Sequence, residues 1–122
     1  MKNLRIRNKY KPSKTNFEYE IELVDIMNYG TISPYKWKFA SESQLNTYKD
    51  VMRFLETLKI TTNTYKIIKK PGAGAFSLKI KVLVENESDV IILSLAGSHL
   101  MKRIYRYVTQ LSEHPTHPLE EE

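Results

Sequence analysis

Two segments near the start of the chain alternate between apolar and polar residues. Residues 17–26 alternate apolar side chains with three glutamates, and residues 31–39 alternate aromatic side chains with two lysines. A period of two is typical of half-buried strands, so the segments predict a hairpin with its turn at residues 28–30. One register satisfies both faces of this hairpin, by charge and by apolar contact. It pairs Glu22 with Lys36, Glu20 with Lys38, Ile21 with Trp37 and Tyr19 with Phe39.

A helix is predicted for residues 41–59. Ser41 and Gln44 have the spacing of a capping box, in which each side chain accepts a hydrogen bond from the other residue's backbone N–H. Apolar residues then recur every three or four positions and form one buried stripe. The stripe consists of Leu45, Tyr48, Met52, Leu55 and Leu58, widened by Val51 and Phe54.

A second, lysine-rich hairpin is predicted from residues 62–69 and 75–85, joined by Pro-Gly-Ala-Gly-Ala at 71–75. Apolar residues of the second strand, from Phe76 to Val84, alternate with outward-facing residues that include Lys79 and Lys81. The whole segment 59–84 contains no acidic residue, so its charge is not neutralised internally. It contains six lysines: Lys59, Lys66, Lys69, Lys70, Lys79 and Lys81.

The last two predicted elements follow a turn at residues 86–89. Residues 90–96 are apolar on both faces, which indicates a central strand. Gly97 ends this strand, and Ser98 caps a final helix over residues 98–111. Its buried stripe is Leu100, Ile104, Tyr107, Val108 and Leu111, and its exposed face carries Lys102, Arg103 and Arg106.

The predicted element order is therefore ββαβββα. We expect an α+β fold, a two-layer sandwich with a five-stranded, mostly antiparallel sheet and two helices on one face. Residues 1–16 are predicted to be a basic N-terminal arm with a short strand at 4–7, and a solvated, disordered tail is the alternative. Residues 17–112 form the single domain, and residues 113–122 form an acidic tail.

Composition narrows the class of protein. The 122 residues carry a net charge of +5, distributed as +6 in residues 1–16 and −4 in residues 113–122. The chain has no Cys, no apolar run long enough to span a membrane and no apolar secretory signal, so a cytoplasmic protein is expected. Abundant Lys, Ile, Tyr and Asn suit an AT-rich genome, such as that of many viruses and mobile elements.

No motif predicts catalysis. The loop at 71–75 lacks the Gly-Lys-Ser/Thr of a phosphate-binding loop, and a strand follows it instead of a helix. The turn at 96–99 precedes a helix N-terminus but has a single glycine, and His99 lacks a nucleophile motif. His114 and His117 have no third ligand nearby in the sequence. The expectation is a non-enzyme with no catalytic residue, no metal and no cofactor.

The remaining signal is a set of basic residues interleaved with aromatic residues. Lysine and arginine neutralise phosphates, and exposed aromatic rings stack on bases. The prediction is a non-catalytic nucleic-acid-binding protein that prefers RNA or single-stranded DNA, because no helix resembles a major-groove reader. The predicted binding residues are Lys66, Lys69, Lys70, Lys79, Lys81, Lys102, Arg103, Arg106, Arg5, Arg7, Tyr65 and Tyr105.

Two other hypotheses remain open. The first alternative is a small protein-binding factor with an acidic partner, such as a viral or mobile-element inhibitor of a host protein or an assembly subunit. The second is a binder of small phosphorylated ligands through Gly72 and Gly74. No membrane partner is expected, and an exposed edge strand would also allow a homo-oligomer.

Overall fold

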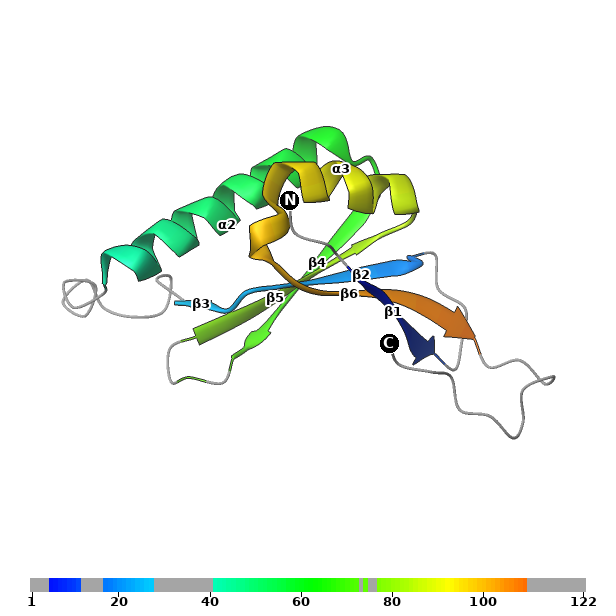
Figure 1. Cartoon of the computed structure of the whole chain (residues 1–122), viewed down its shortest axis with the longest axis horizontal. Helices are drawn as coiled ribbons and strands as arrows, with labels where there is room; N and C mark the ends of the chain where they lie inside the picture. The colour runs from blue at the N-terminus through cyan, green and yellow to red at the C-terminus, as the bar shows by residue number, and fades with distance from the viewer. Residues whose placement is uncertain (1–4, 12–16, 28–40, 73, 75–76, 110–122) are drawn as a thin grey trace.

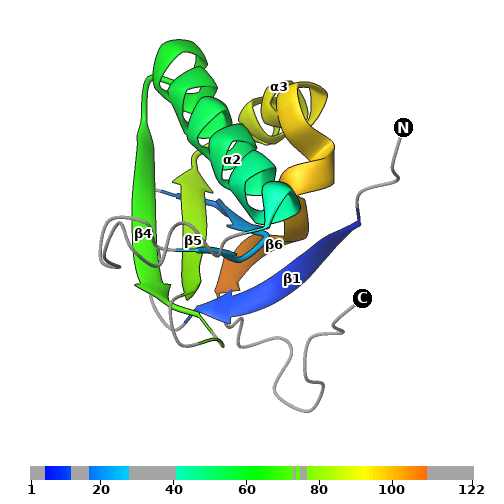
Figure 2. The same ribbon diagram turned by 90° about the vertical axis from the view of Figure 1, so that its left-hand side faces the viewer.

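The computed structural model describes residues 5–11, 17–27, 41–72, 74 and 77–109. Both helices of the described residues lie over one face of a twisted sheet, and neither of them covers the other face (Figures 1 and 2). The elements in chain order are β1 (Ile6–Lys11), β2 (Tyr19–Leu23), β3 (Ile26–Met27), α2 (Glu42–Thr61), β4 (Tyr65–Pro71), β5 (Ser77–Val84), α3 (Glu87–Gly97), the 3₁₀ helix η1 (Ser98–Leu100) and β6 (Met101–Thr109).

The sheet is mixed. Its strand order is β1-β6-β2-β5-β3, with β4 paired to β5, and β1 runs parallel to β6 while every other pair is antiparallel. Leu78 pairs with both Ile26 and Pro71, and Val84 pairs with both Tyr19 and Tyr65, so β2 and β3 lie along one edge of β5 and β4 lies along the other. The α+β class and the presence of two helices beside the sheet are confirmed, although only the first helix lies where it was predicted. The sheet has six strands instead of five and is mixed instead of mostly antiparallel.

A row of aliphatic residues crosses the sheet beneath the helices. In register they are Ile6, Ile104, Ile21, Val82 and Ile67, one from each of β1, β6, β2, β5 and β4. The three central residues of this row are fully buried, and the two outer ones pack against the core from the edges. Burial of β-branched side chains on one face, together with α2 residues Val51, Phe54, Leu55 and Leu58, builds the core.

The predicted helix at 41–59 and the lysine-rich hairpin are confirmed. The Ser41 hydroxyl accepts from the Gln44 N–H at 3.1 Å, and the Gln44 side chain accepts from the Ser41 N–H at 2.8 Å. Ile80, Val82 and Val84 face the core as predicted. Phe76 lies outside the described residues.

The last two elements are reversed relative to the prediction. Residues 90–96 belong to helix α3, not to a strand, and residues 101–109 form strand β6, not a helix. The expected turn at 86–89 is the helix start, where the Asp89 carboxylate accepts from the Asn86 N–H at 3.4 Å. In β6, Ile104 and Val108 alternate with Tyr105 and Tyr107. Alternating β-branched and aromatic residues suit a strand that lies between β1 and β2.

The predicted partner of the first strand is also wrong. Glu22 pairs with Lys81 of β5 on one edge and with Arg103 of β6 on the other, so both edges of β2 are occupied. Glu20 and Glu22 therefore do not face Lys38 and Lys36 across a hairpin. Residues 28–40 themselves lie outside the described residues.

Part of the predicted N-terminal arm belongs to the sheet. Residues 6–11 form β1 and pair with β6 from Ile6↔Ile104 to Lys11↔Thr109. The strand thus begins later and extends further than the short strand predicted at 4–7. This pairing places three more basic residues, Arg7, Lys9 and Lys11, in the sheet.

Candidate functional site

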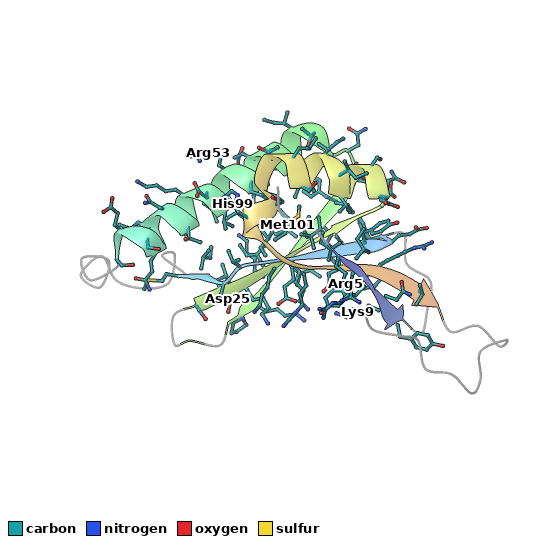
Figure 3. The ribbon with its side chains drawn as sticks, viewed as in Figure 1. Arg5, Lys9, Asp25, Arg53, His99 and Met101 are labelled. Carbon is teal, nitrogen blue, oxygen red and sulfur yellow. The ribbon has the colours of Figure 1, made fainter. Side chains whose placement is uncertain are left out.

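The face of the sheet opposite the helices, here called the open face, carries most of the charged strand residues. Because successive side chains of a strand point to opposite faces of the sheet, every residue in register with Glu20 or Glu22 lies on the open face. One row reads Arg7, Tyr105, Glu20, Leu83 and Lys66 across the sheet. The next reads Arg103, Glu22, Lys81 and Ile68. Figure 3 shows Arg5 and Lys9 on this same side, away from the helices.

Basic residues from four strands surround two glutamates on the open face. The cations lie on both sides of β2. Those on one side belong to β6 and β1, and those on the other side belong to β5 and β4. They are Arg5, which precedes β1, and Arg7, Lys9, Arg103, Lys79, Lys81, Lys66 and Lys70. The glutamates are only 3% (Glu20) and 4% (Glu22) exposed, so they contribute little to the surface that a ligand would meet.

Glu20 lies in a cluster of three donors. The Lys9 ammonium is 3.2 and 3.3 Å from its two carboxylate oxygens, the Lys81 ammonium is 3.6 Å away, and the Tyr107 hydroxyl donates a short hydrogen bond. Burial opposes ionisation of Glu20. The Tyr107 hydrogen bond and the two ammonium groups nevertheless hold the pKa of Glu20 below its ordinary value. Glu20 is therefore an anion that holds Lys9 and Lys81 against the sheet.

Tyr107 is the neutral partner of this cluster. Burial, followed by its hydrogen bond to Glu20 and the charge of that carboxylate, raises the pKa of Tyr107 well above the ordinary value of a tyrosine. The hydroxyl therefore remains a donor throughout the physiological range, and it is not an activated base or nucleophile.

Glu22 is surrounded by three cations at longer distances. Its carboxylate is 3.5 Å from Lys79, 3.7 Å from Arg103 and 4.0 Å from Lys102. Within the described residues its buried Oε2 atom accepts no hydrogen bond. Lys102 reaches this site because the β2–β6 register shifts at Glu22 and Leu23, which leaves Lys102 in a bulge.

The structure brings together most of the predicted binding residues, but not all of them. Arg5, Arg7, Lys66, Lys70, Lys79, Lys81, Arg103 and Tyr105 lie on the open face, and Lys102 lies beside it in the bulge. Three residues lie on the helix-covered side instead. Lys69 and Arg106 are in register with core residues Ile80 and Tyr19, and Tyr65 packs against the core. Arg103 and Arg106, predicted on one helix face, are on opposite faces of a strand.

Neither predicted stacking aromatic is a free platform. Tyr65 is half-buried in the core. The ring of Tyr105 is covered on one face by the Lys9 ammonium, 4.9 Å from the ring centre. A base stacked on that face of Tyr105 would have to displace Lys9. The open face is therefore an array of cations more than a stacking surface.

Sequence reasoning missed Lys9, Glu20, Glu22 and Tyr107 as members of the site. The glutamates were assigned to a local hairpin, and Tyr107 was placed in the core of a helix. A usable signal was the Glu18-Glu20-Glu22 alternation itself, because the lysine alternation at 79 and 81 matches it as well as residues 36 and 38 do.

The backbone N–H groups of Gly72 and Gly74, at the end of the hairpin, both donate hydrogen bonds within the hairpin. The Gly74 N–H donates to the Ser77 hydroxyl at 2.9 Å, and the Gly72 N–H donates to the Ser77 carbonyl at 3.0 Å. A side chain on Gly72 would approach the Ser77 Oγ to 2.3 Å, so the glycine serves close packing. These N–H groups are not directed at a phosphate.

A reactive site is not assembled elsewhere in the part of the chain that the structure describes. His99 is largely exposed and 3.9 Å from Asp50 at the edge of a small pocket between α2 and η1. Across residues 5–11, 17–27, 41–72, 74 and 77–109, His, Asp and Glu side chains form no group of three that could hold a metal ion. In the same residues, no helix is both long and apolar enough to cross a membrane.

Comparison of the chain with protein-family models, with curated proteins and with solved structures found no match.

Proposed function

We propose that this protein binds single-stranded nucleic acid, RNA or DNA, on the open face and without catalysis. The observation that carries the proposal is the burial of Glu20 and Glu22 beneath the cations of the neighbouring strands. The surface offered to a ligand at the centre of the sheet is then positive across its width. Phosphate groups are the ligand that such an array fits.

The hairpin strands add a second argument. Lys70 of β4 lies directly opposite Lys79 of β5, and like charges in this position destabilise a sheet. Lys66 and Lys70, like Arg7 on the far edge, make no ion pair within the described residues. A bound polyanion would relieve this repulsion and supply the missing partners.

The shape of the face favours a single strand over a duplex. Both described helices lie on the opposite side of the sheet, so neither can enter a major groove from the open face (Figure 2). A flexible strand can follow a twisted sheet, whereas a rigid duplex touches it along a short line. Since Tyr105 is covered by Lys9, we expect binding through phosphates with little base preference.

The test compares two double variants that remove the same charge. Lys66→Gln with Lys70→Gln changes the open face, and Lys49→Gln with Lys59→Gln changes the exposed side of α2. Binding of a labelled oligonucleotide of about 15 nucleotides is measured by fluorescence anisotropy, between about 50 and 200 mM salt. The open-face variant should lose tenfold or more in affinity, and its slope of log K against log salt should fall by about 1.4, or ~0.7 per phosphate contact.

The control variant should bind within twofold of the unchanged protein. Equal losses in the two variants would show a response to net charge alone and would refute a site on the open face. Absence of binding at low salt would refute the function. Capture of one acidic protein after nuclease treatment, lost in the open-face variant, would then favour a protein partner for the same cations.

A further inference from the structure

The open face carries cations at its two outer strands that no acid of the described residues compensates. Arg7 of β1 lies at one end of the row through Glu20, and Lys66 of β4 lies at the other end. Lys70, further along β4, is exposed and lies opposite Lys79. Within the described residues, Arg7, Lys66 and Lys70 make no ion pair. An anion that reached the open face from outside the sheet would therefore find cations without partners.

The basic side chains of the helix layer have acidic neighbours instead. On α2, the Arg53 guanidinium is 3.1 Å from the Asp50 carboxylate, and the Lys59 ammonium is 3.3 Å from the Glu56 carboxylate. These pairs reduce the positive potential on that side of the molecule. An anionic segment of the chain is consequently attracted to the open face more than to the helix layer.

The acidic tail, residues 113–122, has the opposite charge to the open face. It contains no lysine or arginine and four glutamates, three of them consecutive: Glu113, Glu120, Glu121 and Glu122. The tail follows strand β6, whose last residue, Thr109, pairs with Lys11 of β1. The chain therefore enters the tail from the middle of the basic sheet.

The tail is long enough to cross the open face. Lys66 lies three strands away from β6 and four residues back along the strands from Thr109, a distance of about 19 Å at the spacings of a sheet. The residues after Thr109 as far as Glu120 span up to ~36 Å when extended. Pro115 and Pro118 disfavour the helix that would shorten this span. The three consecutive glutamates can thus reach the far strand, β4.

We propose that the acidic tail binds the open face of its own chain, with Glu120, Glu121 and Glu122 against Lys66 and Lys70. A short tether gives the tail an effective concentration of roughly millimolar at this surface, so contacts that are weak individually occupy it. The contact itself needs no nucleic acid. If the open face binds nucleic acid as proposed above, the tail competes with phosphates for the same cations and lowers affinity most at low salt.

Paramagnetic broadening of nuclear magnetic resonance signals tests the contact without nucleic acid. Because the chain contains no Cys, Leu119→Cys provides a single attachment point for a nitroxide spin label beside the glutamates. At low salt the label should broaden the backbone N–H signals of Lys66 and Lys70, and high salt should restore them. Signals of Ile91 and Leu95, on the exposed side of α3, should remain sharp. Dilution should not change the pattern, since the contact lies within one chain.

A matched control carries the same label together with Glu120→Gln, Glu121→Gln and Glu122→Gln. Its β4 signals should be sharp at low salt, because the tail has lost three of its four charges. Equal broadening with and without these substitutions would overturn the proposal, and so would the absence of broadening on β4 in the charged tail. Broadening that disappears on dilution would assign the contact to a second chain and would also overturn it.

Oligonucleotide binding tests the competition. At about 50 mM salt the triple glutamine variant should bind about threefold more tightly or better than the unchanged protein, and the difference should fall below about 1.5-fold at about 200 mM. The control removes the same charge from the helix layer, where it should give less than half of that gain, through Glu42→Gln, Glu56→Gln and Glu87→Gln. A gain no larger than that of the control would overturn the competition. Absence of oligonucleotide binding in every variant, with the spin-label effect intact, would count against the proposed function alone.

Discussion

The Tyr107→Phe substitution isolates the hydrogen bond that links β6 to the buried carboxylate of β2. It removes one hydroxyl oxygen and keeps the ring, so packing beside Glu20 is largely unchanged. Glu20 loses its closest donor but retains Lys9 at 3.2 Å and Lys81 at 3.6 Å. A hydrogen bond to a charged group contributes about 1.5–3 kcal/mol to stability. Because two ammonium groups still compensate Glu20, we expect a loss of about 1.5–2 kcal/mol.

The pH dependence of this loss has a defined sign. The folded-state pKa of Glu20 is depressed, so its contribution is fully present above the unfolded value near 4.5 and is lost as pH falls through the folded value. The folded-state pKa of Tyr107 is raised, so its contribution is present below the unfolded value of 10.0 and is lost as pH rises through the folded value. The difference between the two proteins should therefore be constant between these limits and shrink in acid.

Urea denaturation followed by far-ultraviolet circular dichroism measures the free energy of unfolding at several pH values. At neutral pH the midpoint should fall by about 1 M. Tyr105→Phe is the matched control, because Tyr105 lies on the same face of β6 and its hydroxyl makes no hydrogen bond within the described residues. Equal effects of the two substitutions, or a difference that does not shrink as the pH is lowered from neutral into the acid range, would refute the role assigned to the Glu20–Tyr107 pair.

Three further substitutions test other contacts. Ser41→Ala removes the α2 cap and should cost about 1 kcal/mol in urea denaturation, whereas Ser43→Ala, with no capping bond, should cost little. Gly97→Ala would place a methyl group 2.8 Å from the buried Phe54 ring, so a loss of about 1–3 kcal/mol is expected despite alanine's better helix propensity; a neutral result would contradict this packing. Glu22→Gln releases Lys79, Lys102 and Arg103 for phosphates and should raise oligonucleotide affinity several-fold by anisotropy, whereas lower affinity in a folded variant would contradict the proposed interface.

Local signals in the sequence predicted the parts of the fold that local interactions determine. The Ser41–Gln44 box and the stripe after it define α2 without reference to the rest of the chain. The alternation of residues 77–84 defines both faces of β5, including the outward positions of Lys79 and Lys81. For that reason the outward position of these lysines on the strand was predicted correctly.

The prediction failed where a short apolar segment fits two structures equally well. Residues 90–96 are apolar on all sides, so neither a period of two nor one of 3.6 can be read from them. The structure resolves the ambiguity through contacts outside the segment: Val90 and Leu93 enter the core, and Ile91, Ile92 and Leu95 remain exposed. A helix with an unburied apolar side is expected to bind something, which a strand assignment would have concealed.

The pairing of strands that are far apart in the sequence could not be predicted from the residue pattern either. Glutamates at 20 and 22 can be matched by lysines at 36 and 38, by lysines at 79 and 81, or by Arg103. Charge and spacing alone do not separate these partners, so the pattern favours the pair that is nearest in sequence. The structure selects two distant partners at once, because β2 lies between β5 and β6. The charged cluster on the open face forms only because β2 pairs with both of these strands.

The buried glutamates are difficult to explain by stability alone. A buried ion pair gains little over well-packed apolar residues, since removing charges from water costs about as much as their attraction returns. The residues around Glu20 and Glu22 could have been apolar, as Leu83 and Ile68 are on the same face. Instead the chain keeps cations on both sides of β2 and uses two carboxylates to fix some of them and to reduce their mutual repulsion. Charges retained at a cost to stability are expected at functional sites. In this cluster Glu20 and Glu22 are buried, so the charged groups that remain exposed are cations. This arrangement supports the proposal that the open face binds an anion, with Glu20 and Glu22 holding the neighbouring lysines in place.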